Sequence, residues 1–215
     1  MSQGRLFVLS GPSGAGKGTI CEQIVKDGSA QLSVSMTTRA IRGNEIPNVS
    51  YYFVSDAEFD RTIEEGGFLE YAGIYSHRYG TPKKPVLDAM DAGKDVILEI
   101  EMQGAQQVKT NYPDAVLIFV LPPSLKVLAE RLKGRNSDSA EQIAERTKAT
   151  LSEIHRMKEY DYFVINDTLS DAVNTVKNII SAEHGDKAAA KQTKPNKVNR
   201  CTLRVIKKYD EEALS

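Results

Sequence analysis

The sequence is poor in several residue types that mark particular classes of protein. It has no tryptophan, three histidines and only two cysteines, Cys21 and Cys201, among 215 residues. Two cysteines cannot build a disulfide framework, and their scarcity is typical of a reducing compartment. The histidines show no spacing typical of metal ligands, so we expect no metal site built by protein side chains. They are His77, His155 and His184.

Long apolar runs and a large net charge are also lacking. The formal net charge is −1 at pH 7, which gives no overall field for attracting nucleic acid or anionic lipid. No apolar stretch approaches the roughly 20 residues of a membrane span, and the N-terminus has no charged segment followed by an apolar leader. We therefore expect a cytoplasmic protein that has neither nucleic acid nor a membrane as a partner.

The sequence does contain short apolar runs that alternate with helical patterns. Runs rich in Val, Ile, Leu and Phe lie at 5–10, 95–102, 115–122 and 162–167. Such runs are typical of strands that are covered on both faces. Ser124 is a plausible cap for a helix at 124–135, and Ser139 opens a helical pattern at 139–160. This alternation predicts an α/β fold, in which helices wind a parallel sheet.

Two segments break this alternation. Residues 36–92 contain a short run, SYYFVS, a short helix that Ser55 caps with Glu58 three residues on, and an aromatic stretch. They predict a small mixed lobe that can close over a second ligand, although a decorated loop with no separate role fits the same composition. Residues 186–215 are rich in lysine and poor in apolar residues, which predicts a flexible C-terminal tail.

The segment SGPSGAGKGT at residues 10–19 is the strongest functional motif. Gly11, a four-residue spacer, Gly16 and Lys17 follow an apolar run and precede a helical pattern, which is the context of a phosphate-binding loop. Its N–H groups would converge on nucleotide phosphates. The next residue is Gly18, so the usual hydroxyl ligand of Mg²⁺ is missing. We expect Mg²⁺ to be held mainly by nucleotide phosphates and waters, with Thr19 left to bond a phosphate.

The sequence contains two groups of arginines. One could bind a second phosphate, and the other could assist the transfer of a phosphoryl group. Arg39 and Arg42 lie three residues apart at the start of the predicted lobe, where both could bind one phosphate. Arg131, Arg135 and Arg146 flank a polar break between two helical patterns, which predicts a lid that brings positive charge to a transferring phosphoryl group. Surface arginines and a solvated helical hairpin are the alternatives.

Taken together and in their order along the chain, several segments of the sequence resemble the guanylate kinase family. The similar segments are LSGPSGAGKGT, SVSMTTRAIRGNE, YYFVS, FLEYA, YGTP, ILEIEMQGA, RLKGR and VIND, in that order from about residue 5 to residue 183. The resemblance implies a P-loop NTPase-type parallel sheet, an inserted mixed α/β GMP-binding lobe and a helical lid. The implied domain is residues 1–185, with a core of 1–35 and 93–185, the lobe at about 36–92 and the lid at about 131–147.

The resemblance also implies a role for individual residues. The ATP-binding residues would be Gly11, Pro12, Ser13, Gly14, Ala15, Gly16, Lys17, Gly18, Thr19 and Asn166. Ser35, Glu70, Thr81 and Glu101 would face the guanine of GMP, and Arg39, Arg42, Tyr51 and Tyr79 would hold its phosphate. The catalytic residues would be Lys17, Arg131, Arg135 and Arg146. The implied reaction is reversible: ATP and GMP give ADP and GDP without a covalent intermediate.

Two other functions are compatible with these residues. One is a phosphate-loop kinase for another monophosphate or a small phosphorylated sugar, although the carboxylates of Glu70 and Glu101 favour a base that offers donors at its edge. The other is a guanylate-kinase-like module that binds a phosphorylated protein segment without catalysis. An intact Lys17 and the full set of arginines favour the enzyme. A homo-oligomer is compatible with the sequence.

Overall fold

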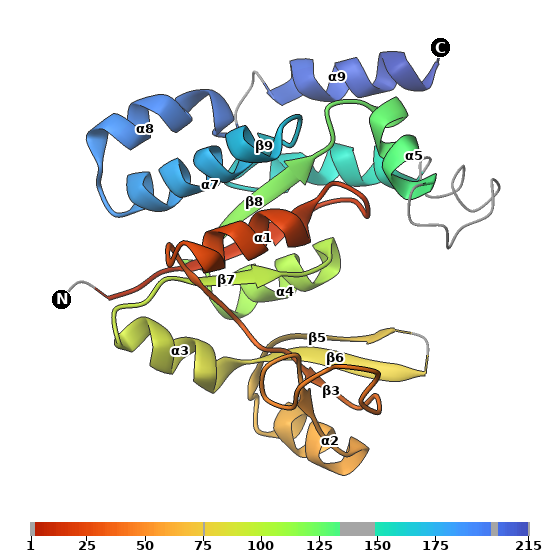
Figure 1. The fold of residues 1–215 in the computed structure, drawn as a ribbon, viewed down its shortest axis with the longest axis vertical. Helices are drawn as coiled ribbons and strands as arrows, with labels where there is room; N and C mark the ends of the chain where they lie inside the picture. Colours follow the sequence, from red (N-terminus) through yellow and green to blue (C-terminus); the bar gives the residue numbers. More distant parts are fainter. Residues whose placement is uncertain (1–2, 75, 134–148, 199–201, 215) are drawn as a thin grey trace. The chain divides into compact units, whose positions relative to one another are not determined.

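The computed structural model describes residues 3–74, 76–133, 149–198 and 202–214. The chain divides into two compact units, which we describe separately (Figure 1). Unit 1 comprises Met1–Phe7 and Ala30–Ala115, and unit 2 comprises Val8–Ser29 and Val116–Ser215. Strand β1 (Leu6–Ser10) begins in the first unit and ends in the second.

Unit 1 contains one edge of a parallel sheet, in the order β2-β7-β1. Strand β2 (Gln31–Leu32) pairs in parallel with β7 (Val96–Glu99). Helix α3 (Lys83–Asp91) precedes β7, and helix α4 (Met102–Asn111) follows it. The first three residues of β7 are buried, as expected for a strand that is covered on both faces.

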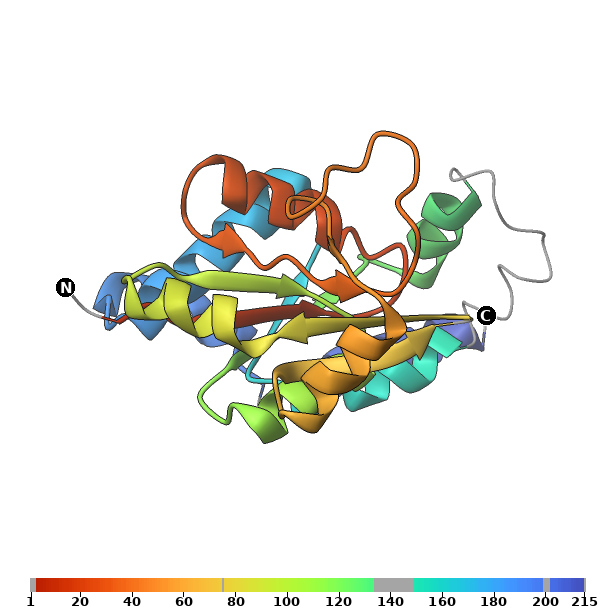
Figure 2. The ribbon, with the colours of Figure 1, turned by 90° about the horizontal axis from the view of Figure 1, so that it is seen from below.

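Unit 1 also contains a four-stranded mixed sheet in the order β4-β3-β6-β5. Its strands are β3 (Met36–Thr37), β4 (Tyr52–Phe53), β5 (Phe68–Ile74) and β6 (His77–Pro82). Strands β5 and β6 are antiparallel, with Glu70 opposite Thr81. Figure 2 shows helix α2 (Asp56–Glu64, orange) beside this hairpin (yellow), where the rings of Phe59 and Phe68 lie 4.6 Å apart.

Unit 2 contains the other edge of the parallel sheet, in the order β1-β8-β9. Strand β8 (Val116–Leu121) is buried along its whole length and pairs in parallel with β9 (Tyr162–Ile165). The helices of this unit include α1 (Lys17–Lys26), α5 (Leu125–Lys133) and α7 (Leu169–Glu183). Residues 149–155 are helical and lead into the 3₁₀ turn Arg156–Glu159.

The predicted fold class is confirmed, because the four apolar runs contain β1, β7, β8 and β9 and helices connect them. Two predicted helix caps are also present. Ser55 Oγ accepts a hydrogen bond from the Glu58 N–H at 3.2 Å, and Ser124 Oγ accepts one from the Val127 N–H at 3.1 Å. The predicted cap Ser139 lies outside the described residues. Among the described helices, none is long and apolar enough to cross a membrane.

The prediction of a flexible tail at 186–215 is wrong for the residues that the structure describes. Helix α8 (Lys187–Thr193) and helix α9 (Thr202–Ala213) form there, and Figure 1 shows α8 beside α7. The apolar positions of α9 are few, but Thr202, Ile206 and Tyr209 recur at helical spacing and are all buried. One narrow buried face is enough to pack a helix, and the charged residues around it concealed that face in the composition.

Candidate functional site

In the loop between β1 and α1, the backbone conformation at Gly11 and at Gly16 is one that favours glycine. Gly16 precedes α1 with a φ of +90°, and a Cβ atom there would lie 2.2 Å from Asn166 Nδ2. Gly11 has a φ of +134°, and a Cβ atom there would lie 2.3 Å from the Val120 carbonyl oxygen. The tight turn between them therefore depends on both glycines, as a loop that wraps its N–H groups around an anion requires.

Lys17 is the first residue of α1, and its ammonium group folds back onto this loop. Lys17 Nζ donates to the carbonyl oxygen of Gly11 at 2.6 Å and to that of Pro12 at 3.1 Å. The first turn of α1 contains no acidic residue that would compete for its N–H groups. A fixed cation beside a helix N-terminus is a favourable place for phosphate oxygens.

Asn166 and Arg131 complete a hydrogen-bonded group around the loop. Asn166 is buried, and its Nδ2 donates to the Ala15 carbonyl oxygen at 2.8 Å. Arg131 Nη2 donates to the Asn166 carbonyl oxygen at 3.0 Å, while Arg131 Nη1 is buried without a hydrogen-bond partner among the described residues. A buried guanidinium nitrogen without an acceptor is costly, so it suits an anionic ligand. The predicted catalytic residues Arg135 and Arg146 lie outside the described part of the chain.

A buried carboxylate lies in the mixed sheet of unit 1. Glu70 is 7% exposed, and its Oε1 accepts a hydrogen bond from Thr81 Oγ1 at 2.6 Å. Burial raises the pKa of Glu70, and the hydrogen bonds from Thr81 oppose that rise. A Cβ atom at Gly104 would lie 2.9 Å from Glu70 Oε2, so this glycine lets α4 approach the carboxylate closely. A carboxylate in such a place is suited to accept hydrogen bonds from a specific ligand.

A small pocket of about 130 Å³ lies in the same unit. Three of the residues predicted to bind GMP line it: Ser35, Tyr51 and Thr81. Ser50 and Glu99 add further polar groups to its wall. Because Thr81 also donates to Glu70, the pocket and the buried carboxylate form one continuous polar region.

Arg39 is the centre of a second cluster in unit 1. It is 6% exposed and forms a two-point ion pair with Glu45, at 2.7 Å and 3.0 Å. Arg39 Nε also donates to Tyr79 Oη at 3.2 Å, and its guanidinium lies 5.4 Å from the ring centre of Tyr51. The ion pair raises the pKa of Arg39 and lowers that of Glu45. Arg42 is exposed and joins this cluster through its backbone N–H, which donates to Glu45 at 2.8 Å.

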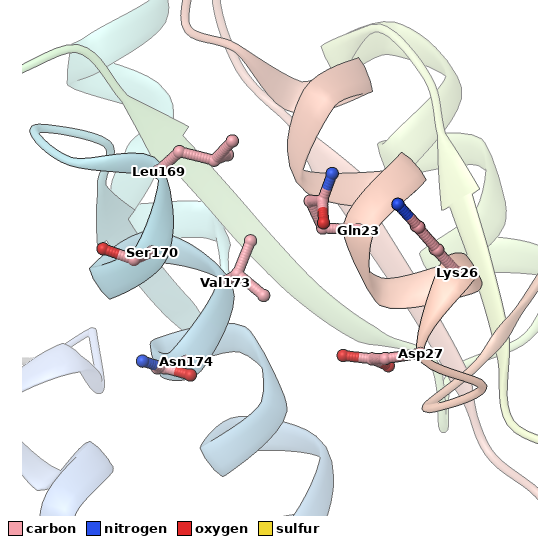
Figure 3. Close-up of a pocket in the computed structure, with 7 residues that line it drawn as sticks. All are labelled: Gln23, Lys26, Asp27, Leu169, Ser170, Val173 and Asn174. Atoms are coloured by element: carbon pink, nitrogen blue, oxygen red, sulfur yellow. The ribbon is translucent and has the colours of Figure 1, made fainter.

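Unit 2 also contains a groove of about 670 Å³ between α1 and α7. Figure 3 shows the side chains that line it, which are Gln23, Lys26, Asp27, Leu169, Ser170, Val173 and Asn174. None of the predicted site residues is among them. The groove is therefore not part of the candidate site.

Residues 3–183 match the family model described as guanylate kinase. The chain belongs to the guanylate kinase family. A curated guanylate kinase of Clostridioides difficile (strain 630) is 44% identical over 213 residues, which are 99% of this chain and 98% of that protein. One of Clostridium acetobutylicum is 50% identical over 181 residues, covering 84% of this chain and 87% of that protein. The crystal structure of guanylate kinase from Anaplasma phagocytophilum has a TM-score of 0.67 and 31% identity, covering 87% of this chain and 90% of that one.

In this member of the guanylate kinase family, the predicted ATP-binding residues lie in unit 2 and the predicted GMP-binding residues lie in unit 1. Several predicted residues take no part in the contacts described above, among them Glu101 and Thr19. Glu101 is exposed at the start of α4, and Thr19 is exposed on α1. Both roles stay predictions.

The sequence reasoning missed two acidic residues of these clusters. Glu45 stands in the quoted segment SVSMTTRAIRGNE, but its pairing with Arg39 depends on the turn between them. Glu99 lies two residues before Glu101, at the end of β7. Because β7 ends at Glu99 and Glu101 directly precedes α4, strand alternation does not relate the two residues, and it gave no signal for Glu99.

Proposed function

We propose that this protein transfers the terminal phosphoryl group of ATP to GMP, giving ADP and GDP in a reversible reaction. The observation that carries the proposal is the presence, in one chain, of a lysine-bearing phosphate loop and a separate buried carboxylate at Glu70. The first suits a nucleotide donor, and the second suits a base with hydrogen-bond donors at its edge. We place the reaction in the cytoplasm, with ATP and GMP as the partners of the protein.

The proposed chemistry needs charge neutralisation rather than a general base. The phosphate of GMP is already an anionic nucleophile near neutral pH, so no side chain has to remove a proton from it. The barrier arises from repulsion between two polyanions and from the need to align them. Lys17 and Arg131 offset the charge on the donor phosphates, and the predicted roles of Arg135 and Arg146 extend this to the transferring group.

Mg²⁺ enters this proposal as part of the ATP substrate. Within the described residues, no group of three or more His, Cys, Asp or Glu side chains could hold a metal ion. The residue after Lys17 is Gly18, which has no hydroxyl ligand to offer. We propose that the ion is held mainly by phosphates and waters, while Lys17 and the loop N–H groups hold the phosphates. When bound, the ion neutralises charge on the phosphate oxygens.

The acceptor site of the proposal consists of a base-binding part and a phosphate-binding part. Ser35, Glu70, Thr81 and Glu101 would bind the guanine, and Arg39, Arg42, Tyr51 and Tyr79 would bind the phosphate. The guanidinium of Arg39 already forms a two-point contact with the carboxylate of Glu45. Phosphate oxygens can accept the same paired N–H donors, which supports Arg39 as a phosphate ligand.

A coupled assay of ADP release tests the proposed function against its two alternatives. The purified protein is supplied with Mg²⁺ and ATP together with GMP, AMP, CMP or UMP. We expect ADP release with GMP and a kcat/KM for AMP about 10⁴-fold lower, because a site built on hydrogen bonds rejects an analogue that lacks the partners. Release with a different monophosphate would indicate another phosphate-loop kinase. No release with any of them would indicate a binding module.

The raised pKa of Glu70 predicts a pH dependence of GMP use. The ionised carboxylate can accept hydrogen bonds from both donors of guanine, whereas protonation turns one of its oxygens into a donor. We therefore expect kcat/KM for GMP to fall as the pH is lowered through the pKa of Glu70. Thr81→Val removes a hydroxyl donor that favours the ionised form, so the midpoint moves to higher pH. The measurement is kcat/KM for GMP from about pH 5 to about pH 8 in both proteins. The phosphate of GMP titrates identically in both, so equal midpoints would contradict the prediction.

A further inference from the structure

Helix α9 supplies a hydrogen-bond acceptor to the first turn of α5. The first four N–H groups of a helix have no partner within the helix. In α5, Ser124 Oγ accepts from the Val127 N–H, as a capping residue does. A second N–H, that of Leu125, donates to Glu212 Oε2 at 2.9 Å. The carboxylate of Glu212 also interacts favourably with the positive end of the helix dipole of α5.

Two further side chains of α9 hold the segment that leads into α5. Tyr209 is 1% exposed, and its hydroxyl donates to the Pro122 carbonyl oxygen. Lys208 Nζ donates to the Pro123 carbonyl oxygen at 2.9 Å. Figure 1 shows α9 beside α5. One face of the C-terminal helix therefore holds Pro122 and Pro123, just before α5, and Leu125, the first residue of α5.

Helix α5 in turn contacts the phosphate loop. Gly14 lies against it so closely that a Cβ atom there would be 2.9 Å from Leu128 Cδ1 and 3.2 Å from Leu132 Cδ2. Arg131 lies between these two leucines in the sequence and donates to the Asn166 carbonyl oxygen. Asn166 then donates to the loop at Ala15. A shift of α5 would therefore move Arg131 and the packing of the loop together.

We propose that α9 is a positioning element for the donor nucleotide, which acts through α5 on Arg131 and the phosphate loop. The proposal rests on the assignment of that loop to ATP in the proposed function. The match to the family model covers residues 3–183, so α9 lies outside that match. Misplacement of a catalytic group by about 1 Å can lower the rate by about 10²-fold, so small displacements of α5 are measurable.

Variants of the full-length protein test this role. Tyr209→Phe keeps the buried ring and removes the hydroxyl that binds Pro122. Glu212→Ala removes the acceptor for the Leu125 N–H, whereas Glu212→Gln keeps an acceptor oxygen and removes the charge. The matched control is Glu211→Gln on the same helix, where the carboxylate is exposed and lies 3.6 Å from Lys207 Nζ.

The expected result is a selective effect on ATP. KM for ATP rises by about 3- to 10-fold in Tyr209→Phe and Glu212→Ala, and KM for GMP changes by less than about twofold. The affinity for a non-hydrolysable ATP analogue with Mg²⁺, measured by calorimetry, falls by the same factor as KM for ATP rises. The KM for ATP of Glu212→Gln lies between that of Glu212→Ala and that of the unchanged protein. The KM for ATP of Glu211→Gln equals that of the unchanged protein.

Two results would overturn the positioning role. One is an unchanged KM for ATP and unchanged analogue affinity in variants whose unfolding midpoint is lowered, which would leave α9 a purely stabilising role. The other is an equal rise of both KM values. If Tyr209→Phe does not fold, the Glu212 variants carry the same test. If the unchanged protein releases no ADP with GMP, the proposed function fails, whereas the analogue affinities still decide the role of α9.

Discussion

Lys17→Ala is expected to lower kcat by about 10²-fold or more while the protein stays folded. The ammonium of Lys17 is held by two carbonyl oxygens of the loop, so its position is fixed before the substrate binds. Preorganised charge of this kind stabilises the transition state without a cost of reorganisation. The variant therefore loses transition-state stabilisation rather than only ATP affinity. The measurement is kcat at saturating ATP and GMP, with the unfolding midpoint as a check on folding.

Lys26→Ala is the matched control for this experiment. Lys26 lies on the same helix, at its other end, where its side chain is exposed beside the groove of Figure 3. Like Lys17→Ala, Lys26→Ala removes one positive charge, so any effect of net charge alone is common to both variants. We expect near-normal kcat in Lys26→Ala. Near-normal kcat in Lys17→Ala as well would refute a catalytic role for the loop.

Those parts of the fold that depend on local pattern could be predicted from the sequence. Strand β8 is one continuous apolar run, and the structure buries all six of its residues. The phosphate loop was predictable because its glycines and Lys17 lie within a single turn of chain. The cap at Ser55 follows from a hydroxyl three residues before an N–H donor, and it is present in the structure. In each case the signal lies in residues that are close together in the sequence.

Contacts between distant residues could not be predicted in this way. Asn166 reaches Ala15 across 151 positions, and Arg131 reaches Asn166 across 35. No periodicity or spacing encodes such pairs. The C-terminal helix shows the same limit, because the burial of Tyr209 depends on the Pro122 segment far earlier in the chain. The composition of residues 186–215 is polar and predicted a flexible tail. The packing of one face of α9 nevertheless makes this part of the chain fold.

Glu70→Ala is expected to raise KM for GMP by about 30- to 150-fold. This factor corresponds to about 2 to 3 kcal/mol of binding free energy, which is the cost of losing a charged hydrogen-bond partner. Guanine presents its N1–H and 2-amino groups as donors on one edge, and a carboxylate can accept from both. Glu70 Oε1 accepts a hydrogen bond from Thr81 Oγ1, and the second oxygen, Oε2, lies 2.9 Å from the position that a Cβ atom at Gly104 would take.

The same variant should narrow the preference for GMP over AMP, because it loses the good substrate and gains little for the poor one. Adenine has a lone pair at N1 and no 2-amino group, so an ionised Glu70 would face an acceptor and stay unpaired. Glu70→Gln keeps an oxygen for Thr81 and removes the charge, so it separates base recognition from a local loss of packing. Glu64→Ala, an exposed carboxylate on α2, is the control and should leave both substrates unchanged. Normal GMP kinetics and an undiminished GMP preference in both Glu70 variants would show that this carboxylate only stabilises the β5–β6 hairpin, and that another group selects the acceptor.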